Sequence, residues 1–186
     1  MAAVARAHGA GLPLIDQTPR PGLAGTIAFL HPKASQGVLV EMAQPPASPG
    51  RASPSPNPSK SPRVEGVYVA TAAPAGAAET LARNLGGLLG APEKDAGLDA
   101  RLTTITLGGS RLCVLTPAGP ASPVSGWLAE RGEGLFGVGL RLDDLDAARR
   151  RLEAAGVPVH APAAEPIRWR IRIEPTHAHG LHLLLG

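Results

Sequence analysis

Two widely separated stretches of the sequence follow one pattern: HPKASQGVLVE at residues 31–41 and EPTHAHGLHLL at residues 174–184. In each, a proline precedes a glycine by five residues, and an apolar run typical of a strand follows. The segments before them also correspond, with TIAFL matching WRIRI and GAGLPLI matching GVPV. Because order and spacing agree over about forty residues, the chain contains two copies of one supersecondary unit.

A segment rich in proline and serine, PPASPGRASPSPNPSKSP, separates the first copy from the rest of the chain. Such a composition supports neither a helix nor a central strand, so residues 45–63 are assigned as a linker, with a partner-binding proline motif as the alternative. Residues 1–44 hold only the end of one unit and too little core to fold alone. They must therefore dock on something, pair with another chain or stay mobile.

From residue 64 onward, the sequence reads twice as a strand, a helix and further strands. The pattern of residues 73–90 predicts a helix with one apolar face, formed by Ala78, Leu81, Leu85 and Leu88. LTTITL, a GGS turn and RLCVLTP predict a hairpin. The second round begins with a strand at Leu135, and Asp143 or Asp144 caps the helix that follows. This order predicts an α+β fold of tandem βαβββ modules, preceded by a partial module.

Composition excludes several classes of function. The formal net charge is only +3 and the basic residues are scattered, so nucleic-acid binding is not expected. A single cysteine, Cys113, rules out an intramolecular disulfide framework and suits a reducing compartment. No run is long and apolar enough for a signal peptide or a membrane span. We therefore expect a cytoplasmic protein that has no contact with nucleic acid or membrane.

Three phrases carry a family resemblance: SRLCVLTP, SGWLAERGEGLFGVGLRLDDLDAARRRLEAAGVPV and IEPTHAHGLHLLL. Residues 64–186 resemble the vicinal-oxygen-chelate superfamily, which includes glyoxalases, bleomycin-resistance proteins, methylmalonyl-CoA epimerases and dioxygenases. LPLIDQTPRPGLAGTIAFLHPKASQGVLVEMAQ resembles the C-terminal end of a methylmalonyl-CoA epimerase. The resemblance implies a glyoxalase-like domain at 64–186 and makes residues 1–44 the C-terminal remnant of a first such domain. It also implies a homodimer.

In this superfamily two βαβββ modules form a cup, and ligands from four strands hold a divalent metal inside it. The corresponding positions of residues 64–186 are Gly66, Cys113, Gly137 and Leu184. Glycine and leucine offer no donor and a lone thiol suits a hard cation poorly, so no metal is expected in this domain. Glu41 stands at the final ligand position of the N-terminal piece. The resemblance thus allows a divalent metal only through a missing N-terminal module.

Other side chains are weaker candidates. Arg168, Arg170 and Arg172 alternate with apolar residues, so they predict one basic strand face that grips a phosphate or carboxylate, or else a solvent-exposed face. A second group contains histidines that fit either a zinc site or a solvated turn, namely His160, His177, His179 and His182. Cys113 lies among apolar neighbours and is expected in the core.

Two functions follow from the resemblance. The first is a glyoxalase-like protein related to methylmalonyl-CoA epimerase or lactoylglutathione lyase, in a truncated or degenerate form. If active, it would be a metal-dependent isomerase or lyase that acts on an acyl-CoA or a glutathione adduct. The alternative is a non-catalytic module of the same fold that binds a small ligand or dimerises. Fold alone decides neither the substrate nor the chemistry.

Overall fold

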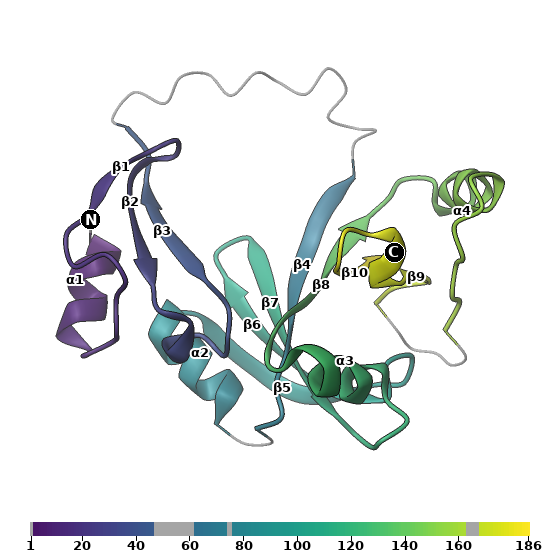
Figure 1. The fold of residues 1–186 in the computed structure, drawn as a ribbon, viewed down its shortest axis with the longest axis horizontal. Coiled ribbons are helices and arrows are strands. Elements are labelled where there is room, and N and C mark those ends of the chain that lie inside the picture. Colours follow the sequence, from purple (N-terminus) through teal and green to yellow (C-terminus); the bar gives the residue numbers. More distant parts are fainter. Residues whose placement is uncertain (1, 47–61, 74–75, 163–167) are drawn as a thin grey trace.

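The computed structural model describes residues 2–46, 62–73, 76–162 and 168–186, which form two separate β-sheets (Figure 1). A three-stranded sheet belongs to the N-terminal piece, residues 2–46, and a seven-stranded sheet belongs to residues 62–186. Most of the linker assigned at residues 45–63 lies outside the described residues. Within the described part of the chain, no helix is long and apolar enough to cross a membrane.

The N-terminal piece consists of helix α1 (Ala2–Gly9) and strands β1 (Arg20–Gly22), β2 (Gly25–Leu30) and β3 (Val40–Gln44). The strands pair antiparallel in the order β1-β2-β3. One face of the sheet packs on α1 around a small core that includes Val4, Ala28 and Leu30. The strand expected within residues 9–15 is wrong: only Leu14 forms a bridge, to Leu30.

The seven-stranded sheet has the order β5-β6-β7-β4-β8-β10-β9. Its first module contains β4 (Arg63–Ala70), α2 (Ala77–Leu85), β5 (Leu88–Asp95), β6 (Ala100–Leu107) and β7 (Ser110–Pro117). Helix α3 (Pro123–Arg131) leads to the second module, which contains β8 (Gly134–Arg141), α4 (Leu145–Ala154), β9 (Ile171–Ile173) and β10 (His182–Leu185). The modules join where β4 and β8 pair antiparallel. The predicted α+β fold of tandem modules is confirmed.

The repeated proline-to-glycine spacing has a common geometric cause. Pro32 and Pro175 each begin a short 3₁₀ helix, Pro32–Ala34 and Pro175–His177. The N–H of Gly37 donates to the Pro32 carbonyl at 3.0 Å, and that of Gly180 donates to the Pro175 carbonyl at 2.8 Å. Both glycines have positive φ, 79° and 89°, a conformation that glycine adopts without strain. The same turn therefore enters β3 in the first copy and β10 in the second.

The second part of the chain differs from the sequence-based expectations in three places. The helix expected over residues 73–90 is α2 alone, because Gly86 adopts φ 73° and closes it, so that Leu88 begins strand β5. Helix α3 lies where no element was expected, and its N-cap Ser122 accepts a hydrogen bond from the Val124 N–H at 3.1 Å. The GVPV segment forms no strand; only His160 bridges, to Arg172.

The N-terminal piece docks on the outer side of the first module. The Asn84 side chain on α2 donates to the Ala34 carbonyl at 2.9 Å, and Leu85 packs against the core of the piece. Val38 in turn packs against the cluster beneath α2. Of the alternatives left open by the sequence, docking within the chain is therefore the one realised in the structure.

The N-terminal piece approaches the rest of the chain most closely at Gly37. A Cβ on Gly37 would lie 2.3 Å from the Glu133 carbonyl oxygen, and its φ is 79°. We expect Gly37→Ala to lower the free energy of unfolding by about 1–3 kcal/mol and to expose the N-terminal piece to protease. Urea denaturation and limited proteolysis check this. The control is Gly109→Ala, where a Cβ meets nothing within 4 Å; equal behaviour of both variants would show that the piece does not dock.

Candidate functional site

The four positions that correspond to metal ligands lie on four neighbouring strands, in the order β7, β4, β8 and β10. Gly66 pairs with Gly139 and Leu184 also pairs with Gly139, while Tyr68 pairs with both Gly137 and Cys113. Paired residues face the same side of a sheet, so all four positions share one face, the concave face, which lies opposite the face covered by α2 and α4. The structure brings them together as the resemblance implies.

Gly137 is crowded by the neighbouring strand. A Cβ at this position would lie 2.4 Å from the His182 carbonyl oxygen and 3.0 Å from the His182 Cβ. Contacts this short are excluded by van der Waals repulsion, so β10 can approach only a glycine here. No side chain, and therefore no ligand, fits at Gly137 without moving β10.

Cys113 and Leu184 belong to a packed core. Cys113 and Leu184 are 2% and 1% exposed, and Tyr68 packs with both in a single cluster. Tyr68 passes over Gly139, because a Cβ there would meet its ring at 3.0 Å. Burial raises the pKa of the Cys113 thiol and of the Tyr68 hydroxyl, so both stay protonated at neutral pH. The concave face is therefore apolar and filled at Cys113 and Leu184.

The residues at these positions do not fit a divalent metal. Two have no side chain, one is an alkyl group, and the fourth is a thiol whose raised pKa disfavours the thiolate that binds metals. Within residues 2–46, 62–73, 76–162 and 168–186, no three His, Cys, Asp or Glu residues form a group that could hold a metal ion. No step of a reaction can be assigned to a metal on this face.

Glu41 lies apart from the concave face. It is exposed on β3, paired with Phe29, and lines a mainly apolar groove of about 330 Å³. Val67 and Val69 form part of the opposite wall; they face the α2 side of β4, opposite Tyr68. A metal role for Glu41 stays a prediction, because Glu41 belongs to no group of three or more His, Cys, Asp or Glu residues among the described residues that could hold a metal ion.

The structure places the predicted arginines in different surroundings. Arg168 forms an ion pair with Glu93 on β5, and Arg172 donates to Glu174 at 2.9 Å. Arg172 pairs with Leu184 across β9 and β10, so it faces the concave side. Trp169 packs in the cluster on the concave face, whereas Ile171 packs in the cluster beneath α4. The expected alternation of a basic and an apolar strand face therefore does not extend beyond β9. Substrate binding by Arg168, Arg170 and Arg172 stays a prediction.

The four histidines do not gather into one group. His177 and His179 are exposed in the turn, while His182 is 4% exposed and stacks on Phe136 with ring centroids 4.2 Å apart. The Glu174 carboxylate lies 3.6 Å from both His160 Nε2 and His182 Nδ1. Burial lowers the pKa of His182 to about 4, so its imidazole is neutral at physiological pH.

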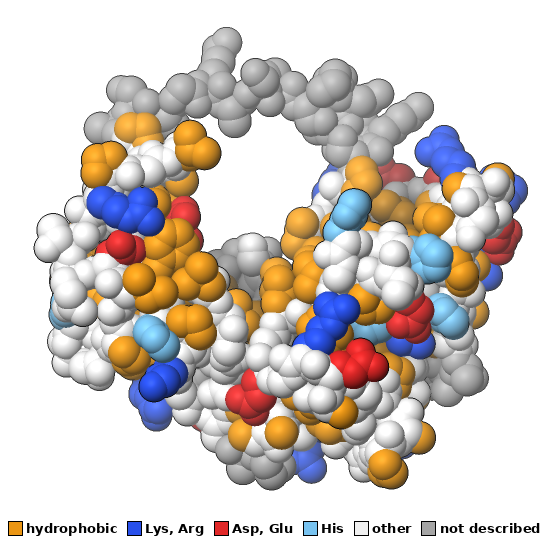
Figure 2. Space-filling model, in the orientation of Figure 1, with side chains coloured by type: hydrophobic (Ala, Val, Ile, Leu, Met, Phe, Trp, Pro, Cys, Tyr) orange, Lys and Arg blue, Asp and Glu red, His pale blue; other side chains and the backbone are white. Residues whose placement is uncertain are grey.

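A pocket of about 500 Å³ opens at the end of the concave face, between α3 and the β9–β10 turn. Its polar lining includes Trp127, Arg131, Arg172, Glu174 and His182. In Figure 2, basic, acidic and histidine side chains gather on this part of the surface. Sequence reasoning missed the pocket, because α3 was not expected and nothing in the sequence links Trp127 to His182.

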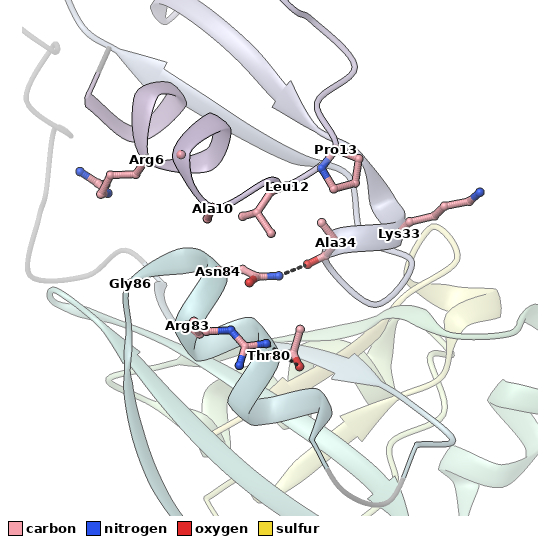
Figure 3. Close-up of a pocket in the computed structure, with 11 residues that line it drawn as sticks. Arg6, Ala10, Leu12, Pro13, Lys33, Ala34, Thr80, Arg83, Asn84 and Gly86 are labelled. Atoms are coloured by element: carbon pink, nitrogen blue, oxygen red, sulfur yellow. Dashed lines mark hydrogen bonds between the residues drawn. The ribbon is translucent and has the colours of Figure 1, made fainter.

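A larger crevice of about 710 Å³ lies between the N-terminal piece and α2 (Figure 3). Its lining contains the basic residues Arg6, Lys33 and Arg83. Figure 3 shows that Arg6 and Lys33 point away from each other and out of the crevice, while Asn84 spans it to reach Ala34. The crevice is thus a docking seam without convergent polar groups.

Comparisons with known proteins agree with this fold. The family model of the Glyoxalase/Bleomycin resistance protein/Dioxygenase superfamily matches residues 7–173. The ethylmalonyl-CoA/methylmalonyl-CoA epimerase of Cereibacter sphaeroides is 33% identical over 95 residues, which cover 50% of this chain and 71% of that protein.

Solved structures show the same fold. The methylmalonyl-CoA epimerase of Mycobacterium tuberculosis superposes with a TM-score of 0.58 and 25% identity, covering 66% of this chain and 85% of that one. A variant of the Streptomyces coelicolor epimerase in complex with 2-nitronate-propionyl-CoA superposes with a TM-score of 0.58 and 23% identity, covering 66% and 92%. The chain belongs to the Glyoxalase/Bleomycin resistance protein/Dioxygenase superfamily.

Proposed function

We propose that residues 64–186 form a metal-independent ligand-binding module, related to methylmalonyl-CoA epimerases but without their metal-dependent chemistry. One observation carries this proposal: the four positions that correspond to metal ligands are two glycines, a protonated thiol and a buried leucine, and Tyr68 packs against the last two. A metal-dependent epimerase needs a Lewis acid at this place to stabilise the enolate formed when its substrate loses a proton.

Crowding at Gly137 supports the interpretation that the metal site has been lost rather than changed to use a different ligand. An altered site would keep room for a different donor, whereas β10 here approaches so closely that a Cβ would lie 2.4 Å from the His182 carbonyl oxygen. Packing of Leu184 into the core is the second support, because buried apolar surface occupies the position that corresponds to a polar metal ligand in the superfamily. The N-terminal piece, which carries Glu41, is proposed as the corresponding end of a related module.

Metal analysis together with a turnover assay tests the proposal. The purified chain is dialysed against Co²⁺ or Mn²⁺, its metal content is measured, and epimerisation of methylmalonyl-CoA is followed. We expect no tightly bound ion and no turnover. The proposal would be overturned by about one ion per chain together with turnover that disappears in Glu41→Ala, because Glu41 would then complete a working metal site.

The proposed ligands are acyl-CoA esters, the kind of molecule named for the relatives, with the glutathione adducts implied by the superfamily resemblance as the second choice. The homodimer expected from the resemblance also stays a proposal. Its support is an apolar edge: Leu88 and Leu89 on the edge strand β5 are 77% and 43% exposed.

A further inference from the structure

We infer that the free edge of strand β3 binds an extended segment of a partner protein, which adds a strand parallel to β3. The inference goes beyond the proposed function, because it concerns the N-terminal piece rather than residues 64–186. β3 is the last strand of the three-stranded sheet and pairs with β2 alone. Figure 1 shows β3 on the side of this sheet that faces β4 and β7.

The hydrogen bonds of β2 show which backbone groups of β3 are open. The Phe29 carbonyl accepts a hydrogen bond from the Ile15 N–H, so it points away from β3. Glu41, which is paired with Phe29, therefore directs its own N–H and carbonyl away from β2. By alternation the same holds for Ala43 and for Leu39, just before the strand. Within the described part of the chain, no hydrogen bond uses the backbone groups of these three residues, and all three are exposed.

The second copy of the repeated unit shows what covers such an edge. β10 follows the same turn as β3 and pairs antiparallel with β9, as β3 does with β2, but its other edge pairs parallel with β8. Beyond β10, the Gly186 N–H donates to the Leu140 carbonyl at 3.0 Å, and the Gly186 carbonyl accepts from the Leu142 N–H at 2.8 Å. Counted from the turn glycines, Gly186 corresponds to Ala43. The groups that bond to β8 in the second copy are thus the groups that β3 leaves open.

The strands of this chain do not suit that edge. β8, the strand that fills this place in the second copy, is already bonded on both sides, by β4 and β10. β5 has a free edge, but it contains Pro92, which has no N–H, and its register shifts between Leu89 and Pro92. A regular parallel ladder on β3 is therefore better supplied by a different protein, in the manner of strand addition to an exposed sheet edge.

The surroundings of the edge define the chemistry of the partner segment. Glu41 forms no ion pair within the described residues, and the basic residue that lines the same groove, Arg111, is paired with Glu65 at 3.0 Å. A basic partner residue diagonal to Glu41 would complement its charge. β8 has this pattern, because Arg141 lies two residues after Gly139, which stands opposite the position equivalent to Glu41. The groove of about 330 Å³ gives room for apolar side chains of the partner.

A peptide with the sequence of β8, GLFGVGLRL (residues 134–142), tests the inference. The peptide has blocked ends and a fluorescent label, and fluorescence anisotropy measures its binding to the full chain. We expect saturable binding. Glu41→Lys should weaken binding about threefold or more, because a like charge then meets the peptide arginine. Glu153→Lys, an equal change of charge at an exposed position of α4, should leave binding unchanged.

Modified peptides test the ladder and its direction. The backbone groups of Leu140 face β10 in the native sheet, whereas those of Gly139 face β4. A methyl group on the Leu140 nitrogen of the peptide should therefore abolish binding, and one on the Gly139 nitrogen should not. A nitroxide at the N-terminus of the peptide should broaden the amide signal of Leu39 more than that of Gln44, as parallel addition requires.

Four results would overturn the inference. Absence of binding, or equal binding by the two methylated peptides, is incompatible with a ladder at this edge. Stronger broadening at Gln44 would mean that the strand adds antiparallel. A dimer of the chain that the peptide dissociates, detected by analytical ultracentrifugation, would mean that a second copy occupies the edge. None of these results depends on metal content or turnover, so they are distinct from failure of the proposed function.

Discussion

Leu184→Glu should destabilise the protein by about 3–5 kcal/mol without creating a metal site. The substitution restores the carboxylate that corresponds to Glu41, but Leu184 is 1% exposed and packs in the same cluster as Tyr68 and Cys113. The cation opposite Leu184, Arg172, already donates to Glu174, so the new carboxylate would either compete with Glu174 for it or be forced to take up a proton. Urea denaturation at pH 7.5 measures the loss, and titration with Co²⁺ should show no recovery of stability.

Two variants separate charge from packing. Leu184→Met keeps the volume and apolar character, and should cost less than about 1.5 kcal/mol. The reciprocal change, Glu41→Leu, affects an exposed side chain of β3 and should stay within about 0.5 kcal/mol. A stable Leu184→Glu protein that gains stability with Co²⁺ would contradict the proposal that the concave face has lost its metal site.

The free energy of unfolding should fall by up to about 3 kcal/mol between pH 7 and pH 4 because of His182 alone. Burial lowers the pKa of this imidazole to about 4 in the folded protein, below the value near 6.5 of the unfolded chain. As the pH falls through 6.5, the unfolded chain takes up a proton that the folded protein refuses. Stability is therefore complete above this pH and decreases until the pH reaches the folded pKa.

Comparison of variants isolates this contribution. Urea denaturation at several pH values should give a flatter profile for His182→Gln than for the wild type, even though lost stacking on Phe136 lowers its stability at every pH. His177→Gln removes an exposed imidazole and is expected to keep the wild-type profile. Parallel profiles for the wild type and His182→Gln would mean that His182 is not buried as a neutral group.

Local patterns in the sequence were sufficient for most strands and for the repeated turn. The apolar runs at β2, β4, β8 and β10 lie within a few residues of their expected positions. Asp144, one of two expected caps, accepts a hydrogen bond from the Ala147 N–H at 2.8 Å and begins α4. These features depend on residues close together in the chain, which is why periodicity and turn chemistry predict them.

Where a segment's own residues are compatible with either a helix or another structure, the local sequence did not determine which one forms. LLG after Gly86 continues a helical pattern, yet it forms β5 because the glycine closes α2 and the segment pairs with β6. Helix α3 has a weak apolar pattern and depends on Trp127 and Val124, which are buried against the concave face. In both cases a partner from elsewhere in the chain decides the structure.

The loss of donors at three of the four ligand positions is determined by the sequence itself, because the side chains of glycine and leucine bind no metal in any fold. At the fourth, Cys113, burial in the folded protein keeps the thiol protonated. Only the tertiary structure decided what replaced the site. In the folded chain, β10 lies close to Gly137, Leu184 is buried against Tyr68, and the Trp127 indole, which has no hydrogen-bond partner, lies near Arg172 and His182. Residue chemistry can be read one position at a time, whereas burial and pairing depend on segments that meet only when the chain has folded.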